Sequence, residues 1–296
     1  MQLSCLPVSL YPDFAAGRQT LGDWFRLAAA LGLDGADVSV AHLPDRRPAA
    51  LDTLRQAATD AGVPIVMLAT YSDFTHPDPW ERARQRDDLR GWIQAAARLG
   101  VVFLRLTAGQ AYAGVVEEVA IGWAVEGLTA CLEEAAAAGV QLLYENHVRG
   151  AVWRRNDATQ AADRFLEVVR RTAGSGLGLL FDTANSLVLG DDPLALLHQV
   201  SDRVRAVHVS DIRRAGAFEP TVVGTGVAPI PELLQILVAR GFDGWVSIEE
   251  ASHTGEDGFR RARAYADQAW QAAGGQPRAA RARSTVRRDT AGSNVW

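Results

Sequence analysis

Four apolar runs in the second half of the sequence each end in, or close to, a side chain that can bind a metal ion. These side chains are Glu145, Asp182, His208 and Glu249. Three carboxylates and one imidazole form a hard, mostly oxygen donor set, which suits a divalent Mn, Mg, Co, Fe or Zn ion with positions left for substrate oxygens. A single residue of this kind at a strand end is ordinarily a loop residue. Four of them at the ends of successive runs favour a site for one divalent metal ion.

The four runs have the length and composition of buried β-strands, and side chains alternate between the two faces of a strand. Counting back from each candidate ligand predicts which residues share its inward face: Leu143 with Glu145, Leu180 with Asp182, Ala206 and Val204 with His208, and Ser247 with Glu249. The same alternation turns Leu142, Tyr144, Leu179, Phe181, Val207, Val246, Ile248 and Glu250 outward. The agreement of all four runs supports the choice of ligands.

Strand-like and helix-like segments alternate along the first 272 residues. Expected strands are 2–6, 33–39, 63–69, 101–106, 141–145, 178–182, 204–208 and 245–249, and expected helices are 20–31, 48–61, 79–99, 115–138, 157–171, 193–200, 231–240 and 257–272. Eight such units predict a parallel sheet closed into a single (β/α)8 TIM barrel of the α/β class. An open doubly wound sheet would not bring four successive strand ends together.

The barrel accounts for residues 1–273 as one catalytic domain. Residues 274–296 are rich in Arg, Ala and Ser and carry almost no large apolar side chains, so a disordered C-terminal tail is expected there.

Composition excludes several classes of protein. The formal net charge of -5 and the pI near 5.7 give no general attraction for nucleic acid or an anionic membrane. All 30 basic residues are arginine, which excludes a lysine Schiff base, a lysine general base and a Walker-type phosphate loop. No apolar run approaches the length of a membrane span, and Cys5 and Cys131 are far apart. A cytoplasmic enzyme with no nucleic-acid or membrane partner is expected.

The strand ends also carry a family resemblance. The segments Tyr144-Glu-Asn-His147, Phe181-Asp-Thr-Ala-Asn185, Val207-His-Val-Ser-Asp211 and Ser247-Ile-Glu-Glu250 resemble the metal-binding segments of the sugar phosphate isomerase/epimerase family, the xylose-isomerase-like TIM barrels. The resemblance spans about residues 3–272 and implies a metal ion held by Glu145, Asp182, His208 and Glu249. It also implies that Glu145 and Glu249 act as acid and base, and that the protein associates as a dimer or tetramer.

The implied chemistry is removal of a proton beside a carbonyl, through an enediolate stabilised by the divalent metal. Such a site would isomerise or epimerise a sugar, a sugar phosphate or a keto-cyclitol. If the next carbon carries a leaving hydroxyl, the same intermediate loses water, so a lyase similar to inosose or 3-dehydroshikimate dehydratase is the alternative. Two other hypotheses are an accessory subunit that binds sugar without catalysis and a phosphodiesterase similar to endonuclease IV.

Six further polar residues are candidates for substrate binding because they follow the predicted strands. They are His147, Asn185, Asp211, Arg213, Arg214 and His76. His147 would either contact substrate or be an ordinary loop histidine. Some ketose epimerases of the family carry a histidine where Asn185 stands, so the resemblance to the epimerases is incomplete at this position.

Overall fold

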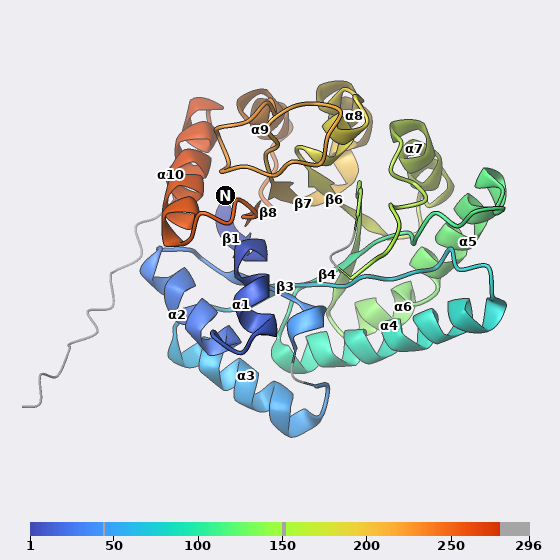
Figure 1. Cartoon of the computed structure of the whole chain (residues 1–296), viewed down its shortest axis with the longest axis horizontal. Helices are drawn as coiled ribbons and strands as arrows, with labels where there is room; N and C mark the ends of the chain where they lie inside the picture. Colours follow the sequence, from blue (N-terminus) through green and yellow to red (C-terminus); the bar gives the residue numbers. More distant parts are fainter. Residues whose placement is uncertain (44, 150–151, 279–296) are drawn as a thin grey trace, which may run out of the picture.

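The computed structural model describes residues 1–43, 45–149 and 152–278, and it shows eight parallel strands arranged as a nearly closed barrel with helices outside (Figure 1). The predicted (β/α)8 fold is confirmed. The strands are β1 (Gln2–Leu6), β2 (Ala36–Ser39), β3 (Ile65–Ala69), β4 (Phe103–Leu106), β5 (Gln141–Glu145), β6 (Gly178–Asp182), β7 (Val204–Val209) and β8 (Trp245–Glu249).

The helices connect consecutive strands and cover the outside of the barrel. They are α1 (Tyr11–Ala15), α2 (Leu21–Ala30), α3 (Pro48–Asp60), α4 (Pro79–Leu99), α5 (Glu117–Thr129), α6 (Leu132–Ala137), α7 (Ala162–Arg171), α8 (Pro193–Val200), α9 (Ile230–Ala239) and α10 (Glu256–Ala272). None of the described helices is both long and apolar enough to cross a membrane.

Three helices differ from the sequence-based prediction, and the first is the short α1, which the prediction does not contain. The helix expected over 115–138 is divided, because Cys131 leaves the helical region (φ -125°, ψ 21°) and buries its side chain in the core. The helix expected from 157 begins at Ala162 instead. Asp157 is buried before it, and its carboxylate accepts hydrogen bonds from the backbone N–H and hydroxyl of Thr159.

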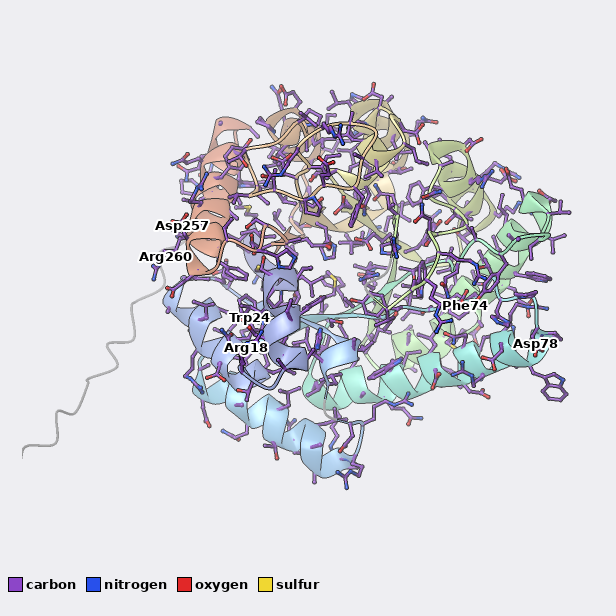
Figure 2. All side chains as sticks on the ribbon, viewed as in Figure 1. Arg18, Trp24, Phe74, Asp78, Asp257 and Arg260 are labelled. Carbon is purple, nitrogen blue, oxygen red and sulfur yellow. The ribbon has the colours of Figure 1, made fainter. Side chains whose placement is uncertain are left out.

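Large side chains fill the space between the strands and the helices. Trp24 is fully buried and its indole N–H donates to the backbone oxygen of Asp37, which ties α2 to β2. Phe74 is buried after β3, and it lies so close to α5 that a Cβ at Gly127 would come within 2.2 Å of its ring. Figure 2 shows these two rings inside the molecule, whereas Asp257 and Arg260 lie on the outer surface of α10.

The inward face of the sheet agrees with the predicted alternation except at one residue. A small cluster inside the barrel contains Phe103, Leu143, Leu180 and Ala206. Val204, predicted to face inward, packs instead with the outer core, so that assignment is wrong. The pairing of β6 with β7 shifts between Leu179 and Leu180, and this bulge places one extra residue between Val204 and Ala206.

The barrel is held together at the β1–β2 seam by side chains. Strand pairing runs from β1 through β8 and down to β2. The Asp34 carboxylate accepts a hydrogen bond from the Leu3 N–H at 2.9 Å, and the Asp34 backbone N–H donates to the Leu3 carbonyl at 2.8 Å. Arg278 then contacts Asp34 at 2.8 Å and Asp267 of α10 at 2.7 Å. The predicted tail, 274–296, is therefore anchored as far as Arg278, and residues 279–296 lie outside the described residues.

Candidate metal centre

The ends of β5 to β8 bring the four predicted ligands into one cluster. Glu145, Asp182, His208 and Glu249 each offer one ligand atom, and these atoms lie within 4.8 Å of one another. The His208 Nδ1 atom lies 2.7 Å from Glu145 Oε1 and 3.0 Å from Glu249 Oε2. The side chains of Glu145 and His208 are buried, whereas that of Glu249 is 27% exposed.

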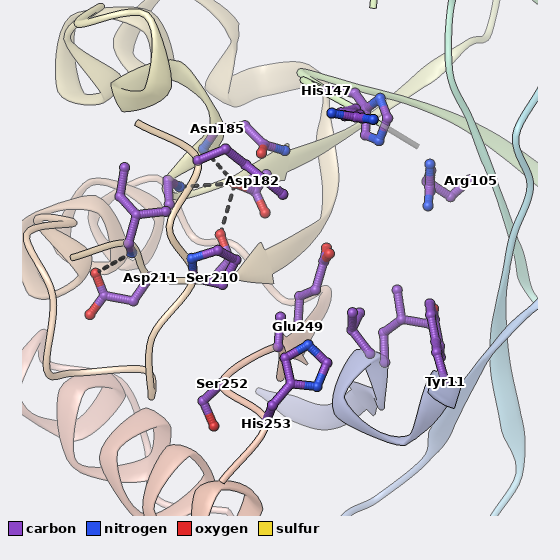
Figure 3. A pocket seen from close by; sticks show the side chains of 18 of the residues that line it. Tyr11, Arg105, His147, Asp182, Asn185, Ser210, Asp211, Glu249, Ser252 and His253 are labelled. Atoms are coloured by element: carbon purple, nitrogen blue, oxygen red, sulfur yellow. Dashed lines mark hydrogen bonds between the residues drawn. The ribbon is translucent and has the colours of Figure 1, made fainter. Parts of the chain in front are cut away.

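The two carboxylate oxygens of Asp182 differ in their hydrogen bonding. Its Oδ1 atom accepts hydrogen bonds from the backbone N–H groups of Ala184 and Asn185 and from the Ser210 hydroxyl, as Figure 3 shows. The side-chain amide of Asn146 bonds both the N–H (2.7 Å) and the carbonyl (2.9 Å) of Asp182. The buried Oδ2 atom has no hydrogen-bond partner among the described residues.

The close packing of these charges shifts their proton affinities. Burial opposes charge on His208, but Glu145 and Glu249 outweigh it and raise the pKa of the imidazole to about 10. Burial and the neighbouring Glu249 and Glu145 raise the pKa of Asp182 to about 7. Burial also acts against ionised Glu145, yet Arg105 and His208 hold the pKa of this carboxyl well below its usual range.

A divalent ion fits this donor set. The cluster supplies three carboxylates and one imidazole, which are ligands that hard and borderline divalent ions accept. Asp182 Oδ2 is a buried oxygen with no hydrogen-bond partner in the described part of the chain, and His208 Nδ1 lies close to an oxygen of each of two glutamates. A metal ion would bind the Asp182 oxygen. It would also replace the proton that His208 Nδ1 shares with the two glutamate oxygens.

A buried arginine stands beside the cluster. The Arg105 side chain, from β4, is 4% exposed, and its Nε atom lies 3.4 Å from Glu145 Oε2. The guanidinium carbon lies 5.1 Å from the ring centre of Tyr71. Neither Nε nor Nη1 has a hydrogen-bond partner within the described part of the chain. Arg105 therefore balances the charge of Glu145 and keeps donor capacity for an oxygen of a ligand.

The cluster lies at the base of a cavity of about 340 Å³. Asp182 and Glu249 line the cavity, but Glu145 and His208 are not among the lining residues. The other walls combine aromatic and apolar surface with polar groups, from Leu6, Val8, Tyr11, Tyr71, Arg105, His147, Arg149, Asn185, Asp211, Ile212, Phe218, Ser252 and His253. Such a wall suits a small ring that has both C–H faces and hydroxyl groups.

His147 forms a pair with a buried carboxylate. Its Nδ1 atom lies 3.5 Å from Asp157 Oδ2, without a hydrogen bond between the two atoms, and both side chains are at least nine-tenths buried. The ring of Trp153 contacts the imidazole edge-on, with 5.3 Å between ring centres. The imidazole is thus held in one orientation at the wall of the cavity.

The other predicted substrate-binding residues are placed differently. Asn185 and Asp211 line the cavity, but the Asp211 carboxylate accepts from the N–H groups of Gly224, Gly226 and Ala228, which fixes the loop after β7.

The remaining candidates lie away from the metal centre. Arg213 and Arg214 are exposed and do not line the cavity, and Arg214 binds Glu219 at 2.7 Å. His76 lines a separate polar cavity together with Asp73 and Tyr112.

Sequence reasoning missed three residues at the centre of the site. Tyr11 follows β1, Tyr71 follows β3, and Arg105 lies within β4. The signal for Arg105 was present, because a charged residue alternates with apolar ones and shares its face with Phe103 of the interior cluster. Tyr11 and Tyr71 follow their strands without any pattern that marks them.

Comparison with known proteins identifies the family of this chain. The family model for the xylose isomerase-like TIM barrel matches residues 25–271. The chain belongs to this family. Among relatives of this xylose isomerase-like chain, the inosose dehydratase of Lacticaseibacillus casei is 27% identical over 139 residues. That match covers 42% of this chain and 44% of the dehydratase, so the chain spans less than half the length of the relative.

Solved structures of the family superpose over almost the whole chain. D-psicose 3-epimerase, solved in the presence of D-fructose, matches with a TM-score of 0.72 and 16% identity, covering 91% of this chain and 99% of the epimerase. The IOLI protein, solved with a zinc atom, matches with a TM-score of 0.74 and 18% identity, covering 92% and 98% of the two chains. These likenesses show the fold shared with other xylose isomerase-like barrels.

Proposed function

We propose that this protein is a divalent-metal-dependent dehydratase that removes water from a small polyhydroxylated ketone, such as a keto-cyclitol. The observation that carries the proposal is the inequality of the two glutamates. The Glu249 side chain is 27% exposed and lines the cavity, whereas that of Glu145 is 1% exposed and lies behind Arg105. One accessible carboxylate supplies one base, acting on one face of a bound substrate.

The metal ion, held by Glu145, Asp182, His208 and Glu249, would withdraw electrons from the substrate carbonyl and acidify the neighbouring C–H group. Glu249 removes that proton. Arg105, whose Nη1 atom has no hydrogen-bond partner among the described residues, binds an oxygen of the substrate next to the cluster. The burial of Arg105 and Glu145 strengthens the charged contact between them.

His147 supplies the acid for the second half of the reaction. The hydroxyl on the next carbon leaves with its C–O bond electrons and takes a proton from the imidazole, which produces water and a carbon–carbon double bond. Trp153, which packs edge-on against the ring, and the buried Asp157 carboxylate, 3.5 Å from Nδ1, together restrict the position of the imidazole for this transfer. The proton on Glu249 then passes to solvent and His147 recovers one, so that the net change is loss of one water.

Epimerisation is the second candidate, because the fold is shared with D-psicose 3-epimerase. It requires a proton donor on the opposite face of the carbon from which Glu249 removes the proton. Glu145 is poorly placed for this role, since it is buried against Arg105 and His208. Asn185 also cannot exchange protons as a histidine at that position would. The dehydratase therefore fits the described site better.

The test is to incubate the metal-loaded protein in heavy water with a panel of ketoses, ketose phosphates, inososes and 3-dehydroshikimate. The wild type should incorporate deuterium beside the carbonyl and release water. His147→Asn should retain deuterium exchange while release of water slows about 100-fold. Asp157→Asn should slow water release less, because the imidazole is still present.

Two results would overturn the proposal. The first is exchange with formation of an epimer and no loss of water, which would establish the epimerase. The second is metal-loaded, folded protein that exchanges with no compound, which would favour a sugar-binding accessory subunit. Metal content is measured in every variant, so that loss of the ion is not mistaken for loss of a catalytic group.

A further inference from the structure

The segment after β8 forms one rim of the cavity and contains a residue in an unfavourable backbone conformation. Ala251, Ser252 and His253 line the cavity. His253 has φ of 56° and is the single non-glycine residue with positive φ in the described ranges. For a residue with a Cβ this left-handed conformation costs about 1 kcal/mol or more, so surrounding contacts must impose it.

Two anchors impose the conformation. On one side the His253 N–H donates to the Ser9 hydroxyl at 2.8 Å, and the Ser9 N–H donates to the Glu250 carbonyl at 2.9 Å. On the other side the buried Glu250 carboxylate accepts from the N–H of Ser252 at 3.0 Å and from its hydroxyl. The start of α10 lies directly over this anchor, because a Cβ at Gly258 would lie 2.8 Å from Glu250 Oε1.

The anchors hold the backbone, but they leave the imidazole free. The His253 ring makes no hydrogen bond or ion pair with the rest of the described chain, and it is the backbone N–H alone that is bonded. His253 is an exposed residue at the rim of the cavity, and Figure 3 shows its ring on the same side as Glu249 and Tyr11. A glycine would adopt this φ without cost. The loop therefore carries a strained residue whose side chain contributes nothing to the fold.

Donors and acceptors are unevenly distributed around the cavity. Arg105 and His147 supply them on the side of β4 and β5, and Asn185 on the side of β6. On the β8 side the Ser252 hydroxyl is already bonded to Glu250 and Thr254. The Glu249 carboxylate and the Tyr11 hydroxyl lie deeper on this side, and His253 adds an imidazole on the rim segment, where it can reach a hydroxyl at the edge of a substrate ring.

We infer that His253 is a substrate-orienting residue, whose imidazole hydrogen-bonds a hydroxyl of a polyhydroxylated ring on the side of the cavity bordered by β8. The inference rests on the proposed function and makes its substrate class more specific. The metal centre fixes the carbonyl end of the ring, and His253 fixes an edge. On this reading a histidine stands at the strained position because its side chain is needed for binding. The hydrogen bonds of the loop with Ser9 and Glu250 hold the backbone in the strained conformation.

The experiment compares His253→Gly with His253→Asn and with Thr254→Gly, a neighbouring change outside the cavity lining. His253→Gly should keep or raise Tm, because glycine accepts the positive φ, while KM rises about tenfold and kcat changes less than threefold. His253→Asn should retain most of the affinity, since asparagine tolerates this backbone region and can hydrogen-bond. Thr254→Gly should leave KM unchanged.

Failure of this inference can be separated from failure of the proposed function. If the wild type is active and His253→Gly has the same KM, the role of His253 is refuted. A fall of several degrees in the Tm of His253→Gly would also refute it. If the wild type turns over nothing, binding is measured as the rise in Tm of metal-loaded protein with each inositol or ketose of the panel. Loss of that rise in His253→Gly would still support the inference. Persistence of the rise, or its absence in the wild type, would refute it.

Discussion

The two halves of the barrel differ in the side chains at the C-terminal ends of their strands. Strands β5 to β8 deliver Glu145, Asp182, His208 and Glu249 to the mouth. Strands β1 to β4 end in uncharged residues, Leu6, Ser39, Ala69 and Leu106. The first half contributes instead a buried cation and two aromatic rings, from Arg105, Tyr71 and Tyr11. The candidate metal ligands therefore come from one arc of the barrel, and the other arc contributes Arg105 together with the buried carboxylate of Asp37 in β2.

All four candidate metal ligands come from the β5–β8 arc, whereas the side chains proposed to contact substrate come from both arcs: Arg105 from one, His147 and His253 from the other. The Arg105–Glu145 contact at 3.4 Å is the point at which the two arcs meet. Changes to the four candidate ligands should remove the metal, whereas changes to Arg105, in the β1–β4 arc, should leave the metal bound and impair the reaction. Each of the following predictions tests whether that separation holds.

The largest effect is expected for Asp182→Asn. Its unpartnered Oδ2 atom would be lost as an anionic ligand, and affinity for zinc or manganese should fall more than the roughly 10- to 100-fold typical of residues that only support a ligand. Calorimetric titration of metal-free protein and elemental analysis measure this. Asp191→Asn is the control, because Asp191 follows the same strand but binds the Ala162 N–H instead. Full metal retention by Asp182→Asn would contradict the ligand assignment.

A smaller and more selective effect is expected for Arg105→Met. Metal content should be unchanged, while activity falls about 100-fold because a charged donor at the substrate is lost. Metal-free Arg105→Met should also be destabilised by about 3 kcal/mol, since Glu145 loses its buried partner.

The bound ion should offset part of that destabilisation, because it replaces the arginine as a counter-charge to Glu145. Thermal denaturation with and without metal measures both changes, and Arg105→Lys is the matched control. Loss of the metal from folded Arg105→Met would show that the two arcs are not separable.

The smallest effect concerns the seam where the arcs join between β1 and β2. Truncation after Arg278 should leave stability within about 0.5 kcal/mol of the full chain. Truncation after Gly274 removes the Arg278 side chain, which is 7% exposed and bonded to Asp34 and Asp267, and should cost about 2 kcal/mol. Denaturant titration of both truncations, together with Arg278→Ala, measures the difference. Equal stability of the two truncations would show that the seam closes without the arginine.

The sequence by itself determined the barrel and the cluster of four ligands. Both depend on patterns that are local in the chain: alternation along each strand, and the regular succession of strand and helix. Parallel strands of a closed barrel present their C-terminal ends at one mouth, so a ligand at each strand end implies a shared site. The same alternation would have identified Arg105. It failed at Val204, because a bulge depends on how β6 pairs with its neighbour and leaves no mark in the composition.

Only the tertiary structure decided which residues at equivalent positions of their strands have the same role. Glu145 and Glu249 are equivalent in sequence, but Arg105 covers the first and leaves the second open to the cavity. Asp211 follows its strand much as His147 does, yet backbone N–H groups from a loop more than ten residues away occupy its carboxylate. The strain at His253 likewise depends on Ser9, at the other end of the chain. Roles of this kind are set by partners distant in sequence, and local patterns carry no information about them.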